Sequence, residues 1–169
     1  MTQVIPRPTL VQPGWGWGPA ADVVALPGTP ESPGQLRTWV AERLRTCGRP
    51  YAQREDLADA LRLVASELAS NAIAHSASGQ EGAYFITTVH FPHDTIGLRV
   101  MDQGPHPERP TRPQEPPHIL SDADLLTAEH GRGLALIAVH SRRYGWTEPP
   151  GHPVHSVWVE LELDPEEAA

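Results

Sequence analysis

The sequence predicts an α+β fold of the two-layer sandwich class, with helices packed on one face of a β-sheet. Three stretches carry apolar residues at helical spacing, namely 32–47, 56–76 and 134–140. Four or five shorter stretches alternate in polarity or are rich in β-branched and aromatic residues, which is typical of strands. Because short connections join several of these strands, we expect hairpins rather than regular β-α-β alternation.

The first half of the chain is expected to fold as a strand and two helices. Asp22–Leu26 is a short strand candidate that a Pro-Gly pair ends. Glu31 or Ser32 lies near the cap of the first helix, and Gly48 ends that helix. The second helix runs from Asp56 to about Ser76, and its apolar stripe consists of Leu57, Leu61, Val64 and Leu68.

The second half is expected to supply the remaining strands. Ala83–Phe91 and Ile96–Met101 flank a Pro-His-Asp turn, which predicts an antiparallel hairpin. Tyr144–Thr147 and Val154–Leu163 are the last strand candidates. Residues 105–130 contain six prolines, so we expect a long irregular loop that is either functional or disordered.

Composition divides the chain into one domain and two flanking segments. Its 169 residues suffice for one domain with a core, and 19 prolines indicate irregular segments beside that domain. We expect a proline-, glycine- and tryptophan-rich extension over residues 1–21, a domain over 22–163 and a frayed acidic tail over 164–169. Trp15 and Trp17 are unusual for a disordered tail, so the extension either packs on the domain or a partner, or is loosely attached.

Charge and composition exclude several classes of protein. A formal net charge of -8 argues against a general binder of nucleic acids or anionic membranes. Cys47 is the only cysteine and cannot form an internal disulfide, and no apolar run approaches the length of a membrane span. The N-terminus lacks the basic start and apolar core of a secretion signal. We therefore expect a soluble cytoplasmic protein.

A polar stripe runs along the second helix. Glu67, Asn71 and His75 are spaced four residues apart, so they lie one turn above another. The Asn71 oxygen could bind a hard cation such as Mg2+, and Glu67 could accept a proton from a hydroxyl near a metal-bound phosphate. The same spacing also occurs on the solvated face of an ordinary amphipathic helix.

Two further motifs come later in the chain. Asp102 directly follows a strand, where its carboxylate could accept a hydrogen bond from the amine of adenine or could serve the backbone of a turn. Gly131-Arg132-Gly133 precedes a short helix. Glycines before a helix N-terminus can admit a phosphate to the backbone N–H groups, although a tight turn requires the same residues.

Together these motifs resemble the N, G1 and G2 boxes of the GHKL ATPases. The matching runs are Glu67-Leu68-x-x-Asn71-Ala72-x-x-His75, Met101-Asp102-Gln103-Gly104 and His130-Gly131-Arg132-Gly133-Leu134. Within that family the chain is most similar to the anti-sigma-factor serine/threonine kinases and their stand-alone relatives. The resemblance covers about residues 22–163.

The resemblance implies a Bergerat fold with a mixed sheet, and ATP with Mg2+ as cofactors. Asn71 would hold the Mg2+, and Glu67 would be the general base that activates a hydroxyl of a partner protein. Asp102 would bind the adenine amine, with Gly104 giving the base room. Gly131-Arg132-Gly133 would surround the phosphates. By the same resemblance the loop at 105–130 would be the ATP lid, while His75 is expected to have a packing role at the helix end.

The activity implied is transfer of the γ-phosphate of ATP to a serine or threonine of a partner regulator, together with binding of a sigma factor. The partner regulator would be an anti-anti-sigma-like protein, and the resemblance includes homodimers. One departure leaves an alternative open. The G1 box usually has a further glycine after Gly104, and Pro105 stands there. The alternative is a docking module that acts by protein–protein interaction. It either binds ATP without catalysis or no longer binds ATP.

Overall fold

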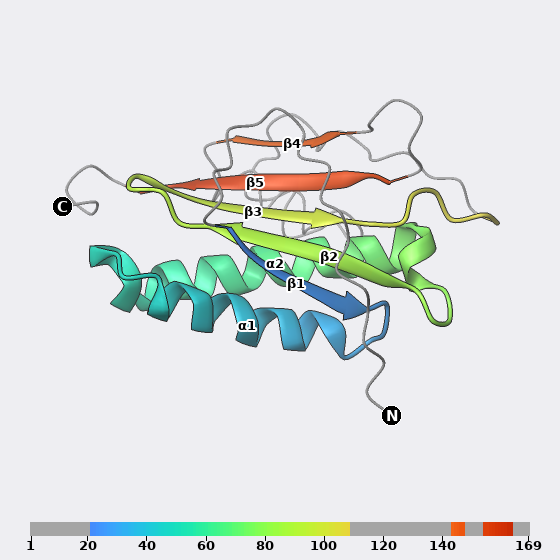
Figure 1. Cartoon of the computed structure of the whole chain (residues 1–169), viewed down its shortest axis with the longest axis horizontal. Helices are drawn as coiled ribbons and strands as arrows, with labels where there is room; N and C mark the ends of the chain where they lie inside the picture. Colours follow the sequence, from blue (N-terminus) through green and yellow to red (C-terminus); the bar gives the residue numbers. More distant parts are fainter. Residues whose placement is uncertain (1–20, 109–142, 148–153, 164–169) are drawn as a thin grey trace, which may run out of the picture.

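The structure, a computed structural model, describes residues 21–108, 143–147 and 154–163. Within these ranges two long helices cover one face of a five-stranded sheet, so the expected α+β two-layer fold is confirmed (Figure 1). The helix expected at 134–140 and most of the loop at 105–130 lie outside the described residues. No described helix is both long enough and apolar enough to cross a membrane.

The described elements follow the predicted order, with boundaries within two residues of the expected ones. Two short 3-10 helices, η1 and η2, were not predicted. The elements are β1 (Asp22–Pro27), α1 (Ser32–Thr46), η1 (Pro50–Gln53), α2 (Glu55–His75), η2 (Ala77–Gly79), β2 (Tyr84–His90), β3 (Thr95–Met101), β4 (Arg143–Thr147) and β5 (Ser156–Glu162).

The strands lie in the order β1-β2-β3-β5-β4, and all four neighbouring pairs are antiparallel. The expected hairpin between β2 and β3 is therefore confirmed. A mixed sheet was expected, and none of the described pairs is parallel. The reason is that β5 lies between β3 and β4 and runs opposite to both of them.

One core lies between the helices and the sheet. Alternate residues of each strand point toward the helices, because successive side chains of a strand face opposite sides of the sheet. Burial of such aliphatic side chains stabilises the fold by roughly 1.5–3 kcal/mol each. Buried aliphatic members include Leu36, Val40 and Leu44 of α1, Leu61, Val64 and Leu68 of α2, and Val89, Ile96, Leu98 and Val159 of the sheet.

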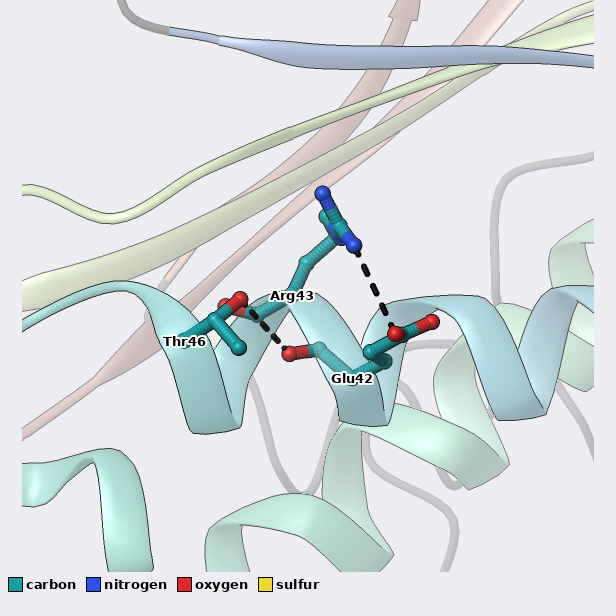
Figure 2. Close-up of polar contacts among 3 residues, drawn as sticks. All are labelled: Glu42, Arg43 and Thr46. Atoms are coloured by element: carbon teal, nitrogen blue, oxygen red, sulfur yellow. Dashed lines mark hydrogen bonds and ion pairs between the residues drawn. The ribbon is translucent and has the colours of Figure 1, made fainter.

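Helix α1 is held at both ends by local polar contacts. At its start, Glu31 is the N-cap but makes no side-chain cap hydrogen bond, while Ser32 Oγ donates to the carbonyl of Pro27 at 2.5 Å. At its end, Thr46 Oγ1 donates to the carbonyl of Glu42 at 2.9 Å (Figure 2). Arg43 forms an ion pair with Glu42 at 3.7 Å (Figure 2). This is the back-bond that a helical threonine makes to the carbonyl four residues before it.

Candidate functional site

Helix α2 presents Glu67 and Asn71 on the flank that lies away from α1. Arg37 of α1 donates to Ser66 Oγ at 2.7 Å, so the Ser66 side of α2 faces α1. At about 100° per residue, Asn71 lies roughly 140° round the helix from Ser66. Glu67 and Asn71 are each partly buried, at the border of the sheet-facing stripe. This position fits side chains at the rim of a site rather than in the core.

The C-terminal end of α2 is tied to the segment that follows β3 by a chain of hydrogen bonds. Ser76 Oγ donates to the carbonyl of Ala72 at 2.6 Å and accepts from the backbone N–H of Ser78 at 3.0 Å. Ser78 Oγ in turn accepts from the backbone N–H of Gln103 at 2.9 Å. Because Asp102 adjoins Gln103, these bonds fix its strand end relative to the helix that carries Asn71.

A second set of contacts strengthens the same junction. The backbone N–H of Ala77 donates to the carbonyl of Gly104 at 2.9 Å, and Ser76 forms an isolated antiparallel bridge with Pro105. The Gln103 side chain donates from Nε2 to the carbonyl of Tyr84 at 3.1 Å, which links the junction to β2. We call the contacts of residues 76–78 with residues 103–105 the helix-strand clamp.

Asp102 is held in a defined orientation at the end of β3. Its backbone N–H donates to the carbonyl of His155 at 2.9 Å, and its Oδ1 accepts from the N–H of Gly104 at 2.7 Å. Gly104 has a φ of 85°, in the left-handed region that favours glycine. An ionised carboxylate has two oxygens with about four lone-pair sites. Asp102 can therefore accept the bond from Gly104 that holds the turn and still accept a second bond from an adenine amine.

Burial makes the Asp102 carboxyl harder to ionise. Desolvation raises its pKa above the ordinary value of an aspartate, while the N–H of Gly104 and the nearby His155 oppose that rise. A carboxylate in such surroundings is a strong hydrogen-bond acceptor for a neutral N–H donor, because little water competes with it. These are the properties required for binding an exocyclic amine.

The structure brings some of the predicted site residues together and leaves others undescribed. The clamp joins the helix of Asn71 to the Asp102–Gly104 turn, and Glu67 lies one turn before Asn71 on the same flank. His75 is the last residue of α2 and is exposed, and its packing role at the helix end stays a prediction. Gly131-Arg132-Gly133 and the part of the loop beyond Glu108 lie outside the described residues.

Ser76 and Ser78 were missed by the sequence reasoning, which treated 76–79 as a simple loop. The signal was present, because serines in turns readily bond to nearby backbone groups. Two glycines also mark the close packing here. A Cβ at Gly79 would lie 2.0 Å from the carbonyl oxygen of Ile73, and a Cβ at Gly28 would lie 1.6 Å from that of Ser78.

The donor set fits Mg2+ in part. Asn71 offers a carboxamide oxygen, which is a ligand that hard cations prefer. No cluster of three or more His, Cys, Asp or Glu side chains with metal-binding geometry occurs among residues 21–108, 143–147 and 154–163. Since Mg2+ commonly takes only one or two protein ligands beside waters and substrate phosphates, Asn71 fits an ion held mainly by a nucleotide.

Comparison with known proteins agrees with this geometry. Residues 27–157 match the family model described as the histidine kinase-like ATPase domain. A curated relative is the serine-protein kinase RsbW of Listeria innocua, which is 30% identical over 114 residues. That alignment covers 66% of this chain and 69% of the relative. The matched range contains the whole clamp together with Glu67, Asn71 and Asp102.

Proposed function

This chain belongs to the family of histidine kinase-like ATPases, and on that premise we propose that it is an ATP-dependent protein kinase of the anti-sigma-factor type. The observation that carries the proposal is the helix-strand clamp, which joins the Asp102–Gly104 turn to the helix of Glu67 and Asn71. An adenine-binding carboxylate and a phosphate-side helix need this fixed relation, because one bound molecule must reach both of them.

Four described residues would bind the nucleotide or take part in phosphoryl transfer. Asp102 would accept the hydrogen bond of the adenine amine, while Gly104 leaves space beside the turn. The Asn71 oxygen would ligate Mg2+. When bound, ATP would supply the phosphoryl group and Mg2+ would neutralise phosphate charge. Glu67 would accept the proton of a partner's serine or threonine hydroxyl as its oxygen bonds to the γ-phosphorus and ADP leaves.

The partner is proposed from the resemblance to anti-sigma-factor kinases. We expect an anti-anti-sigma-like protein as the phosphate acceptor and a sigma factor as the bound target, both in the cytoplasm. Gly131-Arg132-Gly133 remains the proposed phosphate loop, and a homodimer remains part of the proposal.

A second candidate function is a docking module that does not transfer phosphate. It is favoured by Pro105, which occupies the position after Gly104 and forms a bridge with Ser76. Proline fixes its own φ and lacks an N–H group, so this turn has less backbone freedom and one donor fewer than a glycine would give. In this alternative the protein acts by docking on a partner. It either binds ATP without transferring its phosphate or does not bind ATP.

The test separates binding from transfer. ATP with Mg2+ should raise the melting temperature by ligand linkage, and Asn71→Ala should remove the Mg2+-dependent part of that rise. Glu67→Gln should keep the rise and lose transfer of labelled phosphate to a serine of a candidate anti-anti-sigma protein. Equal loss of binding and transfer in Glu67→Gln would assign Glu67 a structural role. Binding by the unmodified chain without transfer to any acceptor would favour the docking module.

A further inference from the structure

His155 lies beside Asp102 at the end of the sheet where the adenine is proposed to bind. Strands β3 and β5 are neighbours (Figure 1), and their pairing places Met101 opposite Ser156. The next pair along is Asp102 and His155, and the backbone N–H of Asp102 donates to the carbonyl of His155 at 2.9 Å. Directly opposed residues of an antiparallel pair carry their Cβ atoms on the same side of the sheet, about 4.5–5.5 Å apart. The carboxyl and the imidazole are therefore neighbours.

Both side chains belong to the side of the sheet that the helices cover. Successive residues of a strand alternate between the two sides. Val100, two residues before Asp102, and Val157, two residues after His155, both pack in the core under the helices. Asp102 and His155 therefore lie on this side as well. It is the side covered by α2, the helix that carries Asn71 (Figure 1).

The two side chains form a polar pair in apolar surroundings. When the pairing of β2 with β3 is continued by one residue, Phe85 lies opposite Asp102, and Leu26 lies opposite Phe85 on β1. Phe85 is 1% exposed, whereas Asp102 and His155 are each half-buried. The pair thus lies at the border of the core, where a ligand can reach it. Sites for small molecules have this composition, with a mainly apolar lining and a few polar groups that set specificity.

The carboxyl and the imidazole also interact through charge. Burial raises the pKa of Asp102, and attraction to His155 is one of the effects that oppose this rise. The interaction agrees with the close approach that the strand pairing requires. In an imidazole one nitrogen can donate while the other makes a different contact. A second contact of His155 is therefore compatible with a bond from its ring to a ligand.

We propose that His155 determines base specificity together with Asp102, by donating an N–H hydrogen bond to a ring nitrogen beside the 6-amine of adenine. The inference rests on the proposed ATP site and adds a residue to it. Adenine presents its amine as a donor and a neighbouring ring nitrogen as an acceptor. The Asp102 carboxylate is the acceptor for the amine, and the imidazole is the donor for the ring nitrogen. Asparagine and glutamine side chains bind adenine with the same pair of one acceptor and one donor.

The two residues would select for different features of the base. Guanine carries a carbonyl oxygen where adenine carries the amine, so the Asp102 carboxylate would meet another acceptor. The contact with His155 instead depends on the ring nitrogen alone. Analogues of ATP that keep the amine and lack one ring nitrogen therefore isolate the contribution of His155.

The experiment compares ATP with 1-deaza-ATP and 7-deaza-ATP, each of which lacks one of the two ring nitrogens beside the amine. Calorimetric titration with Mg2+ would measure the three dissociation constants for the unmodified full chain and for His155→Phe. We expect one analogue to bind the unmodified chain about 3- to 10-fold more weakly than ATP, the effect of one hydrogen bond. In His155→Phe, or in His155→Leu if the first variant folds poorly, ATP should bind as weakly as that analogue.

Two further variants separate base recognition from a structural role. His155→Gln keeps an N–H donor and should restore part of the preference for ATP over the weaker analogue. His93→Phe is the matched control, since His93 is exposed in the turn between β2 and β3, at the other end of β3. This change should leave all three dissociation constants as they are in the unmodified chain.

Two results would overturn the inference and leave the proposed function in place, because ATP still binds in both. One is equal binding of ATP and both analogues by the unmodified chain. The other is an undiminished preference for ATP over the weaker analogue in His155→Phe. Failure of the unmodified chain to bind ATP with Mg2+ would instead overturn the proposed kinase function and this inference together.

Discussion

The two faces of this sheet are both buried, but by different kinds of side chain. The helix-facing side consists almost entirely of aliphatic residues such as Val89, Leu98 and Val159, which pack against α1 and α2. The face that points away from α1 and α2, which we call the outer face, has Arg99 and Trp158 at its centre, each 7% exposed. The comparison teaches that alternation of polar and apolar residues identifies which side of a strand faces the helices, and does not show that the other side faces water.

The largest expected effect compares one residue from each face. Leu98→Ala should lower the free energy of unfolding by about 2–5 kcal/mol, and Trp158→Ala by about 3–5 kcal/mol, because both leave cavities in packed surroundings. Urea unfolding would measure both values. Val23→Ala is the exposed control and should cost little. A cost for Trp158→Ala as small as that of Val23→Ala would show that the outer face is solvated.

A smaller effect is expected at Gly145, where the outer face has no room for a side chain. Gly145→Ala should destabilise the protein by about 1–3 kcal/mol, since its methyl group would displace the Trp158 indole. Gly34→Ala is the matched control within α1. Its Cβ would meet only Arg37 Nη2 at 3.5 Å, so this change should stabilise by about 0.5–1 kcal/mol. The melting temperature should therefore fall in Gly145→Ala and rise in Gly34→Ala, as thermal melting of the two variants would measure.

Ser78→Ala tests the hydrogen bond between Ser78 and Gln103, a polar contact beside the aliphatic core. Loss of Ser78 Oγ leaves the N–H of Gln103 without this acceptor, at a cost of about 1–3 kcal/mol. If the helix-strand clamp positions the site, the increase in melting temperature on addition of ATP should also shrink. Thr38→Ala, an exposed change in α1, is the control. A stability loss with the full ATP response retained would limit the clamp to a structural role.

The smallest effect concerns the pH dependence of stability through Asp102. Its folded-state pKa is raised by burial, so the folded protein holds this proton to higher pH than the unfolded chain does. The resulting stabilisation is complete below the unfolded pKa and is lost as the pH rises through the folded pKa. Asp102→Asn should therefore gain stability relative to the unmodified chain as the pH increases from about 4 toward 7. A stability difference that does not vary with pH would contradict the assignment.

Much of the fold was predictable because it depends on local patterns. The stripe of Leu57, Leu61, Val64 and Leu68 predicted α2, and the short turn after Phe91 predicted the β2–β3 hairpin. The position of Asp102 at a strand end was also predicted, because the residues before it alternate regularly. Neither the clamp nor the insertion of β5 between β3 and β4 could be predicted, since both depend on contacts between segments far apart in the chain.

The sequence by itself determined which side chains face the helices, where α1, α2 and the five strands lie to within two residues, and which short motifs resemble an ATP site. Only the tertiary structure decided that Ser78 joins the end of α2 to Gln103, and that Arg99 and Trp158 are buried on the outer face. The physical reason is that periodicity reports the local geometry of one segment. A hydrogen bond or a buried surface between distant segments depends on the packing of the whole chain.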